Sequence, residues 1–552
     1  MILDIENLQI SFDEKIVVNN FSLKLENSKI LGIVGESGSG KSLSVLSILG
    51  ILPKTANLRY DKMEFNGQRI NPKNNKKIKA IRGKEISMIF QEPMSSLNPS
   101  MTCGQQVAEI LLCHDLADRK TVKSQVVSLF DKVRLPRPTE VYDKYPHQIS
   151  GGQKQRVMIA MAIACRPKLL IADEPTTALD VSVQKEIIEL LKTLQQETEM
   201  SIIFISHDLA LVKNIADEIM VMYKGQIIEK QSSQDIFNHP KQNYTKALLG
   251  ARPQTGVRLR RLPTISDFSN HDFNVEKEEN KDRREKHEIM YTSPPILEVK
   301  QLNKQFKLNS SILSHSTYFK AIDNVSLDVF EGEKLGVVGE SGCGKTTLGH
   351  LITGLLSPDS GQIYYKNNDI TGLSKKQHNS IKKEIQIIFQ DPYSSLNPRI
   401  SIGNAIAEPM KVHKLVNTGK ERRKEVEKLL KAVGLTKEHY NRYPHEFSGG
   451  QRQRIGIARC LALKPKVIIC DESVSALDIS VQAQVLNLLE DLKEEFKLTY
   501  IFISHDLSVV RQFSDRILVM KNGRIVEEGE ADNLYENPSQ EYTKKLIEAI
   551  PN

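Results

Sequence analysis

The sequence of 552 residues contains a long internal repeat. Four segments of the first half return in the same order in the second half: ESGSGKS at 36–42 as ESGCGKT at 340–346, IFQEPMSSLNP at 89–99 as IFQDPYSSLNP at 388–398, YPHQISGGQKQR at 145–156 as YPHEFSGGQRQR at 443–454, and FISHDLALV at 204–212 as FISHDLSVV at 502–510. From Gln91 and its counterpart Gln390 onward, the offset stays at 298 or 299 residues. A repeat at fixed spacing predicts two copies of one domain.

The segment between the copies differs in composition. In NVEKEENKDRREKHE, charges of both signs are mixed with almost no large apolar residue. Such a stretch cannot bury enough apolar surface to offset the entropy lost on ordering. We therefore expect a first domain over residues 1–262, a charged, flexible or partly helical linker over 263–294, and a second domain over 295–552.

Each half shows the same alternation of strands and helices. Apolar strand-like runs, ILGIVG at 30–35 and LGVVG at 335–339, lead into glycine-rich loops followed by helical patterns. Later come LLIAD at 169–173 and VIICD at 467–471, each followed by a helix and another apolar strand. This order predicts an α/β fold with a largely parallel sheet. The stretch between the repeated glutamine and the repeated SGGQ reads mostly as helix, which predicts an inserted helical subdomain.

The composition limits the class of protein. With 39% hydrophobic and 26% charged residues, the chain resembles soluble globular proteins, and no apolar run is long enough for a membrane-spanning helix. The start, MILDIENLQISF, has acids where a signal peptide has lysines, so we expect a cytosolic location. The six cysteines form no close C-x-x-C pair, which argues against a zinc or redox site. A net charge of +8 is mild over this length and does not indicate nucleic acid.

Two glycine-rich loops fit the pattern G-x-x-x-x-G-K-[ST] between a strand and a helix. Backbone N–H groups of such a loop converge on phosphates, and the helix N-terminus adds a partial positive charge. The lysine reaches the β- and γ-phosphates, and the hydroxyl that follows it binds Mg²⁺. We assign nucleotide binding to these residues: Gly35, Glu36, Ser37, Gly38, Ser39, Gly40, Lys41 and Ser42 in the first half, and Gly339, Glu340, Ser341, Gly342, Cys343, Gly344, Lys345, Thr346 and Thr347 in the second.

Adjacent acids end one apolar strand in each half. Asp173 and Asp471 are placed to hold Mg²⁺ beside the loop. Glu174 and Glu472 come next and are placed to polarise an attacking water. The alternative is that these carboxylates only cap the following helix. Their repetition at a strand end favours catalysis.

Two further polar positions are candidates for the same site. Gln91 and Gln390 follow a strand and can orient water or bind Mg²⁺. His207 and His505 end another strand and can contact the γ-phosphate. A single histidine at such a place is usually structural, but its repetition after Phe-Ile-Ser favours a role in catalysis.

The SGGQ segments carry the most specific signal. Ser150, Gly151, Gly152 and Gln153, and again Ser448, Gly449, Gly450 and Gln451, resemble the signature motif of ATP-binding cassette (ABC) proteins. The alternative is a plain helix-start turn, since serine is a good N-cap. The whole ordered set of motifs, including Ala-Leu-Asp at 178–180 and 476–478, resembles this family over almost the entire chain outside the linker.

The resemblance implies two P-loop ATPase domains, each with a mixed, largely parallel sheet, an antiparallel β subdomain and a helical subdomain. It also implies ATP and Mg²⁺ as cofactors. In this family, two cassettes pair head to tail, so the loop with Lys41 would face the second SGGQ and the loop with Lys345 the first. Asp180 and Asp478 would communicate across that pairing.

An aromatic side chain that stacks on adenine is expected in the first strands of each half. Phe12 is the candidate in the first half and Phe306 in the second, with Tyr318 or Phe319 as alternatives. An ordinary core or loop role is equally compatible with these positions.

Departures from the family pattern leave the reacting groups in place. Ile149 and Phe447 stand where leucine commonly opens the signature, Lys154 replaces an arginine, and Ser473 replaces the proline after the catalytic glutamate. We therefore expect two competent ATP sites.

Three features resemble the ATPases of dipeptide, oligopeptide, glutathione and nickel importers: the Q-[ED]-P-x-S-S-L-N-P segments, the SVSALD segment, and the tails HPKQNYTKALL and NPSQEYTKKLI. The resemblance implies an ATP-driven translocase working with two integral-membrane permease subunits and an extracytoplasmic solute-binding protein, at the cytoplasmic face of the bacterial inner membrane. No cysteine follows Cys470, so an iron–sulfur centre in the tail is not expected. The sequence does not identify the transported solute.

A soluble twin-cassette ATPase acting on the ribosome is the alternative. Such proteins also have two cassettes and no membrane part, but their linker contacts RNA. Residues 263–294 contain eight acids against five bases, which disfavours phosphate contact, so no nucleic-acid partner is expected.

Overall fold

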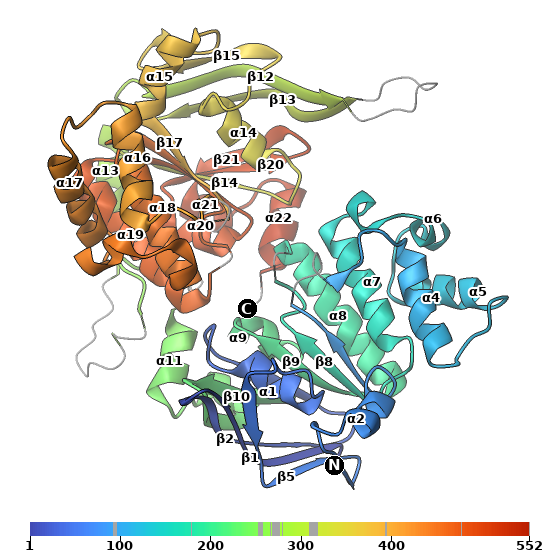
Figure 1. The fold of residues 1–552 in the computed structure, drawn as a ribbon. Helices are drawn as coiled ribbons and strands as arrows, with labels where there is room; N and C mark the ends of the chain where they lie inside the picture. The colour runs from blue at the N-terminus through green and yellow to red at the C-terminus, as the bar shows by residue number, and fades with distance from the viewer. Residues whose placement is uncertain are drawn as a thin grey trace. The chain divides into compact units, whose positions relative to one another are not determined.

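The computed structural model describes residues 1–91, 96–177, 179–251, 258–264, 267, 277–278, 280–307, 318–391, 395–475 and 477–550. The chain divides into two compact units, which are described one at a time (Figure 1). Unit 1 contains Met1–Gly250, and unit 2 contains Ala251–Thr264 and Asp272–Ile550. Both units have the α/β fold that the sequence predicts.

The central sheet of unit 1 has six strands in the order β11-β10-β3-β9-β8-β7. Their bounds are β3 (Ile30–Val34), β7 (Ile86–Ile89), β8 (Leu169–Asp173), β9 (Ser201–Ser206), β10 (Glu218–Tyr223) and β11 (Gln226–Ser232). All neighbours are parallel except β10 and β11. Every residue of β3, β8 and β9 is buried, as expected for parallel strands covered on both faces.

A second sheet of unit 1 is antiparallel. It consists of β1 (Leu3–Phe12), β2 (Lys15–Leu25), β4 (Ala56–Arg59), β5 (Lys62–Phe65) and β6 (Gln68–Arg69). Apolar residues of these strands share one hydrophobic core with α1 and the central sheet. This is the antiparallel β subdomain that the family resemblance implies.

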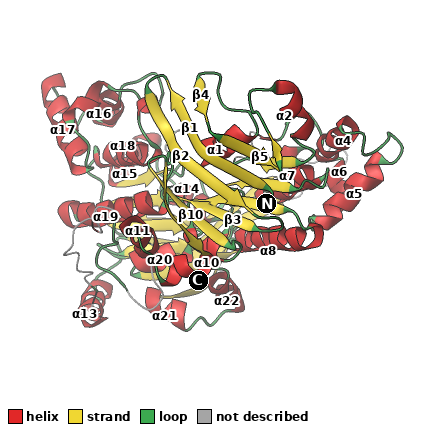
Figure 2. Cartoon of the chain, turned by 90° about the horizontal axis from the view of Figure 1, so that it is seen from below, coloured by secondary structure: helices red, strands yellow, loops and turns green. Residues whose placement is uncertain are grey.

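The helices of unit 1 surround the sheets, as Figure 2 shows in red. They are α1 (Lys41–Ile48), α2 (Asn75–Ile81), α4 (Cys103–Cys113), α5 (Val122–Lys132), α6 (Pro138–Tyr142), α7 (Gly151–Ile163), α8 (Val181–Thr198), α9 (Leu209–Lys213), α10 (Ser233–Asn238) and α11 (Asn243–Gly250). Helices α4, α5 and α6 pack on one another and on α7, and Val126 and Phe130 of α5 are fully buried. The predicted helical subdomain is therefore present.

Unit 2 repeats this architecture. Its central sheet runs β17-β18-β19-β14-β20-β21, and its antiparallel sheet runs β13-β12-β15-β16. The bounds are β12 (Leu297–Lys307), β13 (Tyr318–Val329), β14 (Lys334–Val338), β15 (Ser360–Tyr365), β16 (Asn368–Asp369), β17 (Ile385–Ile388), β18 (Val467–Asp471), β19 (Thr499–Ser504), β20 (Arg516–Lys521) and β21 (Arg524–Glu530). The helices are α13 (Asn280–Tyr291), α14 (Lys345–Ile352), α15 (Lys375–Glu384), α16 (Ile402–Val412), α17 (Gly419–Ala432), α18 (Gly449–Leu461), α19 (Ile479–Phe496), α20 (Leu507–Phe513), α21 (Ala531–Glu536) and α22 (Glu541–Glu548).

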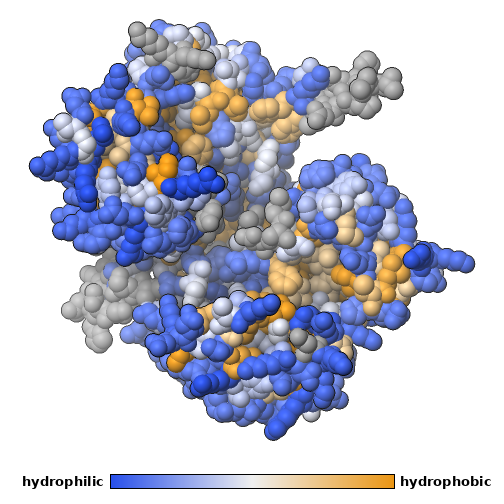
Figure 3. Space-filling model, in the orientation of Figure 1, coloured by the Kyte–Doolittle hydropathy of each residue, from blue (hydrophilic) through white to orange (hydrophobic). Residues whose placement is uncertain are grey.

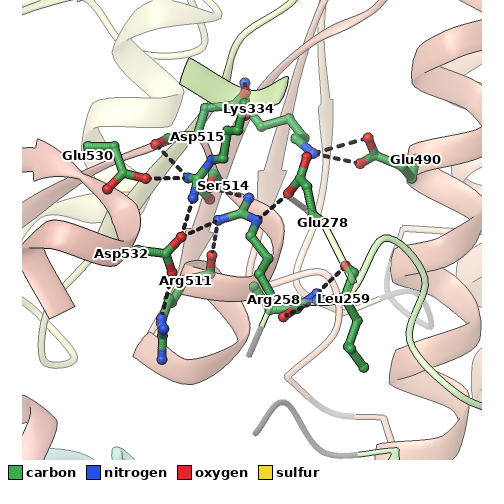
Figure 4. A network of polar contacts seen from close by, with 12 residues as sticks. Arg258, Leu259, Glu278, Lys334, Glu490, Arg511, Ser514, Asp515, Glu530 and Asp532 are labelled. Atoms are coloured by element: carbon green, nitrogen blue, oxygen red, sulfur yellow. Dashed lines mark hydrogen bonds and ion pairs between the residues drawn. The ribbon is translucent and has the colours of Figure 1, made fainter. Parts of the chain in front are cut away.

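Part of the expected linker is folded onto unit 2. We call residues 258–264, 277–278 and 280–291, which include α13, the strap. Arg258 of the strap is buried and donates to the Arg511 and Ser514 carbonyls at 2.8 and 2.6 Å. Figure 4 shows its guanidinium between Glu278 and Asp532, with Nε 2.8 Å from the Glu278 carboxylate.

Helix α13 adds a second set of strap contacts. Arg283 is buried and pairs with Glu530 and Asp532, while His287 lies 3.3 Å from Asp515. The sequence analysis assigned residues up to 262 to the first half and expected a tether after them. The structure instead places 258–264 on unit 2, where the ion pairs of Arg258 and the burial of Leu259 and Leu262 hold the segment.

No helix within the described ranges is long and apolar enough to cross a membrane. On the face seen in Figure 3, apolar side chains form separate patches within hydrophilic surface. Such patches are common on globular proteins, and the larger ones often mark binding sites.

Candidate nucleotide sites

The predicted site residues of each unit meet at one edge of the central sheet. In unit 1, β7, β8, β9 and β3 are parallel neighbours, so their carboxyl ends lie side by side. These ends lead to Gln91, to Asp173 and Glu174, to His207, and to the glycine-rich loop at Gly35. Ligands of open α/β sheets bind at the carboxyl ends of the strands. The fold therefore assembles a site from segments far apart in the sequence.

The glycine-rich loop has a backbone that only glycine adopts without strain at key positions. Gly40, the residue before α1, has φ of 95°, and a Cβ there would lie 2.8 Å from Val18 Cγ2. Gly344 before α14 has φ of 112°, and its Cβ would lie 2.3 Å from the Ala321 carbonyl oxygen. The second strand of each antiparallel sheet therefore lies directly against the loop.

The loop lysines are buried and held by their own loops. Lys41 Nζ donates to the Gly35 and Glu36 carbonyls at 2.7 and 2.9 Å. In unit 2, Lys345 Nζ donates to the equivalent carbonyls of Gly339 and Glu340 at 2.7 and 3.0 Å. A buried ammonium ion at the start of a helix gives each loop a strong positive charge for an anion.

A hydroxyl and a carboxylate meet beside each lysine. Ser42 Oγ donates to Asp173 Oδ1 at 3.0 Å, and Thr346 Oγ1 donates to Asp471 Oδ1 at 3.0 Å. Burial raises the pKa of Asp173 to about 6, and it also raises the pKa of Asp471. Hard oxygen donors of this kind suit Mg²⁺, which takes one or two protein ligands together with phosphates and water. The described residues contain no group of three or more acids, histidines or cysteines that could hold a metal ion.

Glu174 is the centre of a polar cluster in unit 1. Its Oε2 accepts from Gln91 Nε2 at 3.0 Å and from Thr177 Oγ1 at 2.9 Å, and it lies 3.3 Å from His207 Nδ1. Glu174 has φ of 47°, a left-handed conformation that is uncommon for a residue with a side chain. Such conformations concentrate at functional sites.

The charge state of Glu174 follows from these contacts. Burial raises the pKa of its carboxyl, but the hydrogen bond and charge of His207 and the charge of Lys41 lower it more, so it lies at about 2. Glu174 is therefore ionised near neutral pH. Its carboxylate is fixed in direction by its donors, which suits a group that orients and polarises water.

Unit 2 builds the same cluster around Glu472. Its Oε2 accepts from Gln390 Nε2 at 2.8 Å and lies 3.4 Å from His505 Nδ1, and Lys345 Nζ lies 4.0 Å from Oε1. Burial raises the pKa of Glu472 too, but His505 and Lys345 lower it below its usual value. One contact differs, because the Ser475 hydroxyl donates to the Glu472 backbone carbonyl at 2.8 Å and not to its carboxylate.

The SGGQ segments lie apart from these clusters, each at the start of a helix. Ser150 caps α7, where its Oγ accepts from the Gln153 N–H at 3.3 Å and its own N–H donates to Gln153 Oε1 at 3.2 Å. Ser448 and Gln451 make the same reciprocal pair at the start of α18. Ser150 and Ser448 are exposed, so both readings of the motif, capping turn and phosphate-binding turn, fit each unit by itself.

The aromatic candidates lie near the loops. Phe12 is half-buried at the end of β1, whose partner strand β2 contacts Gly40. Phe306 is exposed near the end of β12, opposite Phe319 and next to Tyr318 on β13. The three unit 2 candidates for adenine stacking are therefore neighbours, and the structure does not select one of them. In the motif Ala-Leu-Asp, the positions 178 and 476 lie outside the described residues, while Asp180 and Asp478 begin α8 and α19.

Sequence reasoning missed one pair of residues that contact the loops. The Tyr244 hydroxyl accepts a hydrogen bond from the Glu36 N–H at 3.1 Å, and the Tyr542 hydroxyl accepts from the Glu340 N–H at 3.1 Å. Both tyrosines lie in the repeated tails and are more than 200 residues from the loops in sequence. The repeat of Gln-x-Tyr-Thr-Lys was a signal for a shared role, but it did not identify the partner.

The class of protein now follows. A family model described as ABC transporter matches residues 18–177 and 322–475, more than half of the chain, and the chain belongs to this family. A second model, the C-terminal region of oligopeptide/dipeptide transporters, matches residues 228–272 and 526–552. The chain is therefore an ATPase with two cassettes, in which ATP hydrolysis is coupled to transport.

Similar proteins can be named. The chain is 44% identical to the glutathione import ATP-binding protein GsiA of Escherichia coli strain K12, over 566 residues that cover 100% of this chain and 89% of the relative. The GsiA protein of Shigella sonnei shows the same identity and coverage. Among solved structures, a dimeric ATP-binding cassette bound to ADP and Pi is 31% identical with a TM-score of 0.39, covering 43% of this chain and 98% of that one.

Proposed function

We propose that this chain powers an importer for peptides or a related small solute such as glutathione. The observation that carries the proposal is the match of both tails to the oligopeptide/dipeptide transporter C-terminal region, within a chain whose two halves each hold a complete cluster of loop lysine, hydroxyl, acid pair, glutamine and histidine. Relatives at 44% identity are named for glutathione import. In this proposal the protein lies at the cytoplasmic face of the inner membrane.

The geometry supports a definite role for each residue in ATP hydrolysis. Lys41 exchanges its two loop carbonyls for phosphate oxygens, which have more negative charge. When bound, Mg²⁺ would be held by Ser42 and Asp173, with Gln91 nearby, and would neutralise phosphate charge. The Glu174 carboxylate orients the attacking water, and His207 keeps Glu174 in place and contacts the γ-phosphate. In unit 2 the same roles fall to Lys345, Thr346, Asp471, Gln390, Glu472 and His505.

We further propose that each ATP is shared between the two halves of one chain. Exposed helix starts with bare N–H groups, such as those after Ser150 and Ser448, bind phosphate well. Because each half carries both a loop and an SGGQ turn, head-to-tail pairing would complete two sites. Binding would then hold the halves together, and hydrolysis would release them.

A groove in unit 2 supports the expected permease partner. It lies between β17 and the helices α16 and α18 and has a volume of about 380 Å³. One of its lining residues, Phe389, directly precedes Gln390 in sequence. Its lining includes Phe389, Leu355 and Val412, which are 42%, 49% and 68% exposed. A helical segment of a permease, with apolar side chains, suits a groove of this composition. Two permease subunits and a separate solute-binding protein complete the proposed importer.

The ribosome alternative finds no support. The matched family models are those of transporters, and the acidic linker contributes the strap that packs on unit 2.

The proposal is tested by uptake. The chain is produced in bacteria that lack their own peptide-import ATPases, together with the permeases and binding protein encoded beside its gene. Accumulation of labelled dipeptide, oligopeptide or glutathione is expected, and it should be lost in a Lys41→Ala/Lys345→Ala variant. Absence of uptake, with co-purification on ribosomes and ribosome-stimulated ATP hydrolysis, would replace this function by the alternative.

A further inference from the structure

The last helix of each unit contacts the glycine-rich loop of that unit. Tyr244 on α11 accepts a hydrogen bond from the Glu36 N–H, and Tyr542 on α22 accepts one from the Glu340 N–H, both at 3.1 Å. The two contacts join segments 208 and 202 residues apart in sequence. Because both units make the same contact, it is a property of the repeated fold.

Each of these helices is anchored by a carboxylate, which is buried in unit 1 and half-buried in unit 2. In unit 1, Glu229 of β11 accepts from the N–H groups of Lys241 and Gln242 at 2.8 and 3.1 Å and from Thr245 Oγ1 at 2.5 Å. Burial raises the pKa of Glu229, but these hydrogen bonds lower it more, so the carboxylate stays ionised. A negative charge at the helix start, bound to the N–H groups of the two residues that precede the helix, is favourable and directional.

Unit 2 has the same anchor. Glu527 of β21 accepts from the N–H groups of Ser539 and Gln540 at 2.6 and 3.2 Å and from the Thr543 hydroxyl. Each tail is therefore fixed to the hairpin of the central sheet before it presents its tyrosine.

The tyrosine rings are supported differently in the two units. Tyr223 packs against Tyr244 with ring centroids 4.4 Å apart. The residue at the same position of unit 2 is Lys521, whose Nζ lies 4.7 Å from the centre of the Tyr542 ring. The contacts of the ring differ, while the hydroxyl-to-loop bond has the same length. This contrast identifies the hydroxyl as the feature with a shared role.

The hydroxyl acts on a loop residue that the catalytic lysine also holds. Lys41 Nζ donates to the Glu36 carbonyl, while the Glu36 N–H donates to Tyr244. If Lys41 turns to phosphate, the Glu36 carbonyl keeps its bond from the Ser39 N–H, and the Tyr244 hydroxyl is the side-chain group that holds the Glu36 N–H. Without it, the N–H would need another acceptor or the loop would shift.

We propose that Tyr244 and Tyr542 are positioning residues that keep the phosphate loops in their ATP-binding conformation, and that the oligopeptide-type tail is thereby part of each nucleotide site. This inference rests on the proposed binding of ATP at the two loops.

The test is a Tyr244→Phe/Tyr542→Phe variant of the full chain, which removes two hydroxyls and keeps both rings. Loss of one hydrogen bond per site predicts a KM for ATP raised about three- to tenfold, with kcat within about twofold. The shift in Tm produced by a fixed ATP concentration should shrink, whereas the Tm without ATP changes little. A Tyr223→Phe variant, which removes a tyrosine hydroxyl but keeps the ring that packs against Tyr244, is the matched control and should behave like the original chain.

A second variant separates positioning from simple loss of packing. Glu229→Gln/Glu527→Gln weakens the anchors without touching the loops, and it should raise the KM for ATP in the same direction. An unchanged KM in the tyrosine variant, or equal losses of kcat and Tm in it, overturns the inference while ATP hydrolysis by the original chain stands. If the original chain itself neither binds nor hydrolyses ATP, the proposed function fails instead.

Discussion

The two cassettes are alike at one end of the central sheet and different at the other. At the carboxyl ends of the strands, Glu174 and Glu472 sit in matching clusters of glutamine and histidine. At the opposite end, where β14 and β20 begin, only the second cassette holds the strap. Ser232 and Gln234 of the first cassette correspond to Glu530 and Asp532, the acids that bind Arg283.

The two cassettes also share one contact at the end of the sheet opposite the nucleotide site, and differ there in the strap. Asp217 and Asp515 occupy equivalent positions, and each accepts from the first N–H of the loop-bearing strand at 2.8 Å, from Ile30 and Lys334. Only Asp515 also meets a strap residue, His287. Chemistry requires identical clusters at the nucleotide edge, while the far edge is open to change. There, the carboxylates of Glu530 and Asp532 and the burial of Leu259 and Leu262 hold the strap on unit 2.

The largest expected effect comes from the shared end. Replacing Glu174 and Glu472 together by glutamine removes the carboxylate that polarises water, so ATP turnover should fall about 10²- to 10⁴-fold. Steady-state phosphate release measures it. If the two clusters are equivalent, Glu174→Gln and Glu472→Gln alone should reduce turnover equally, whereas unequal losses would show that the matching geometry hides different sites. Turnover that survives the double change would refute the assigned role.

The strap should matter to the second cassette only. Arg283→Ala removes the hydrogen bonds that its guanidinium donates to Glu530 and Asp532, while Asp532 keeps its pair with Arg511. Loss of these hydrogen bonds to charged groups should lower the free energy of unfolding by about 1.5–3 kcal/mol. Hydrogen exchange should therefore speed up in β14 and β20 and stay unchanged in β3 and β10. Arg260→Ala is the control, because its pair with Asp282 is exposed and should contribute less than about 1 kcal/mol. Equal exchange in both cassettes would contradict the assignment of the strap to unit 2.

Low pH should destabilise the second cassette through Asp515, the strap contact that the first cassette lacks, with a smaller effect than Arg283→Ala. Burial raises the pKa of Asp515, but Lys334 and His287 lower it more, so its folded-state pKa lies well below the ordinary value. A carboxyl with a depressed folded-state pKa stabilises the fold above its unfolded pKa of about 4, and this contribution is lost as the pH falls below that value. Unfolding of the second cassette should therefore become easier below about pH 4, and Asp515→Asn should flatten this dependence. An unchanged acid profile in that variant would show that other groups control it.

The smallest effect concerns the one contact that differs at the shared end. Thr177→Ala removes a donor to the Glu174 carboxylate, whereas Ser475→Ala removes a donor to a backbone carbonyl. We expect a few-fold loss of turnover for Thr177→Ala when the second site is disabled by Glu472→Gln, in line with one hydrogen bond to a charged group. Ser475→Ala, measured with Glu174→Gln, should lose less. The reverse order would mean that the hydroxyl of Thr177 is not part of the working site.

Much of the site could be predicted from the sequence, because an apolar strand that ends in acidic residues is a recognisable pattern. An apolar run followed by Asp173 and Glu174, repeated at Asp471 and Glu472, identifies both the strand and the edge where its carboxyl end lies. The repeat then supplies a check that a single motif lacks. The alternation of strands and helices predicted the parallel sheet, and the helical stretch between the repeated glutamine and the repeated SGGQ predicted the helical subdomain.

The strap and the tyrosine contacts could not be predicted in this way. Arg283 and Asp532 are 249 residues apart, and Tyr244 and Glu36 are 208 apart. Pairing over such distances depends on the packed fold, and no local period marks it. The composition of the linker predicted a flexible or partly helical segment, and α13 is helical. Composition does not, however, identify the ion pairs that hold the strap on unit 2.

The strap also decides where this gene could be divided. From the sequence, the compositional boundary near residue 262 is where a division into two chains would be expected. A second protein beginning at Ile296 would leave the buried carboxylate of Asp515 and the partly buried carboxylate of Asp532 without Arg258, Arg283 and His287. Only a cut before Arg258 would give the second polypeptide its complete set of counter-charges.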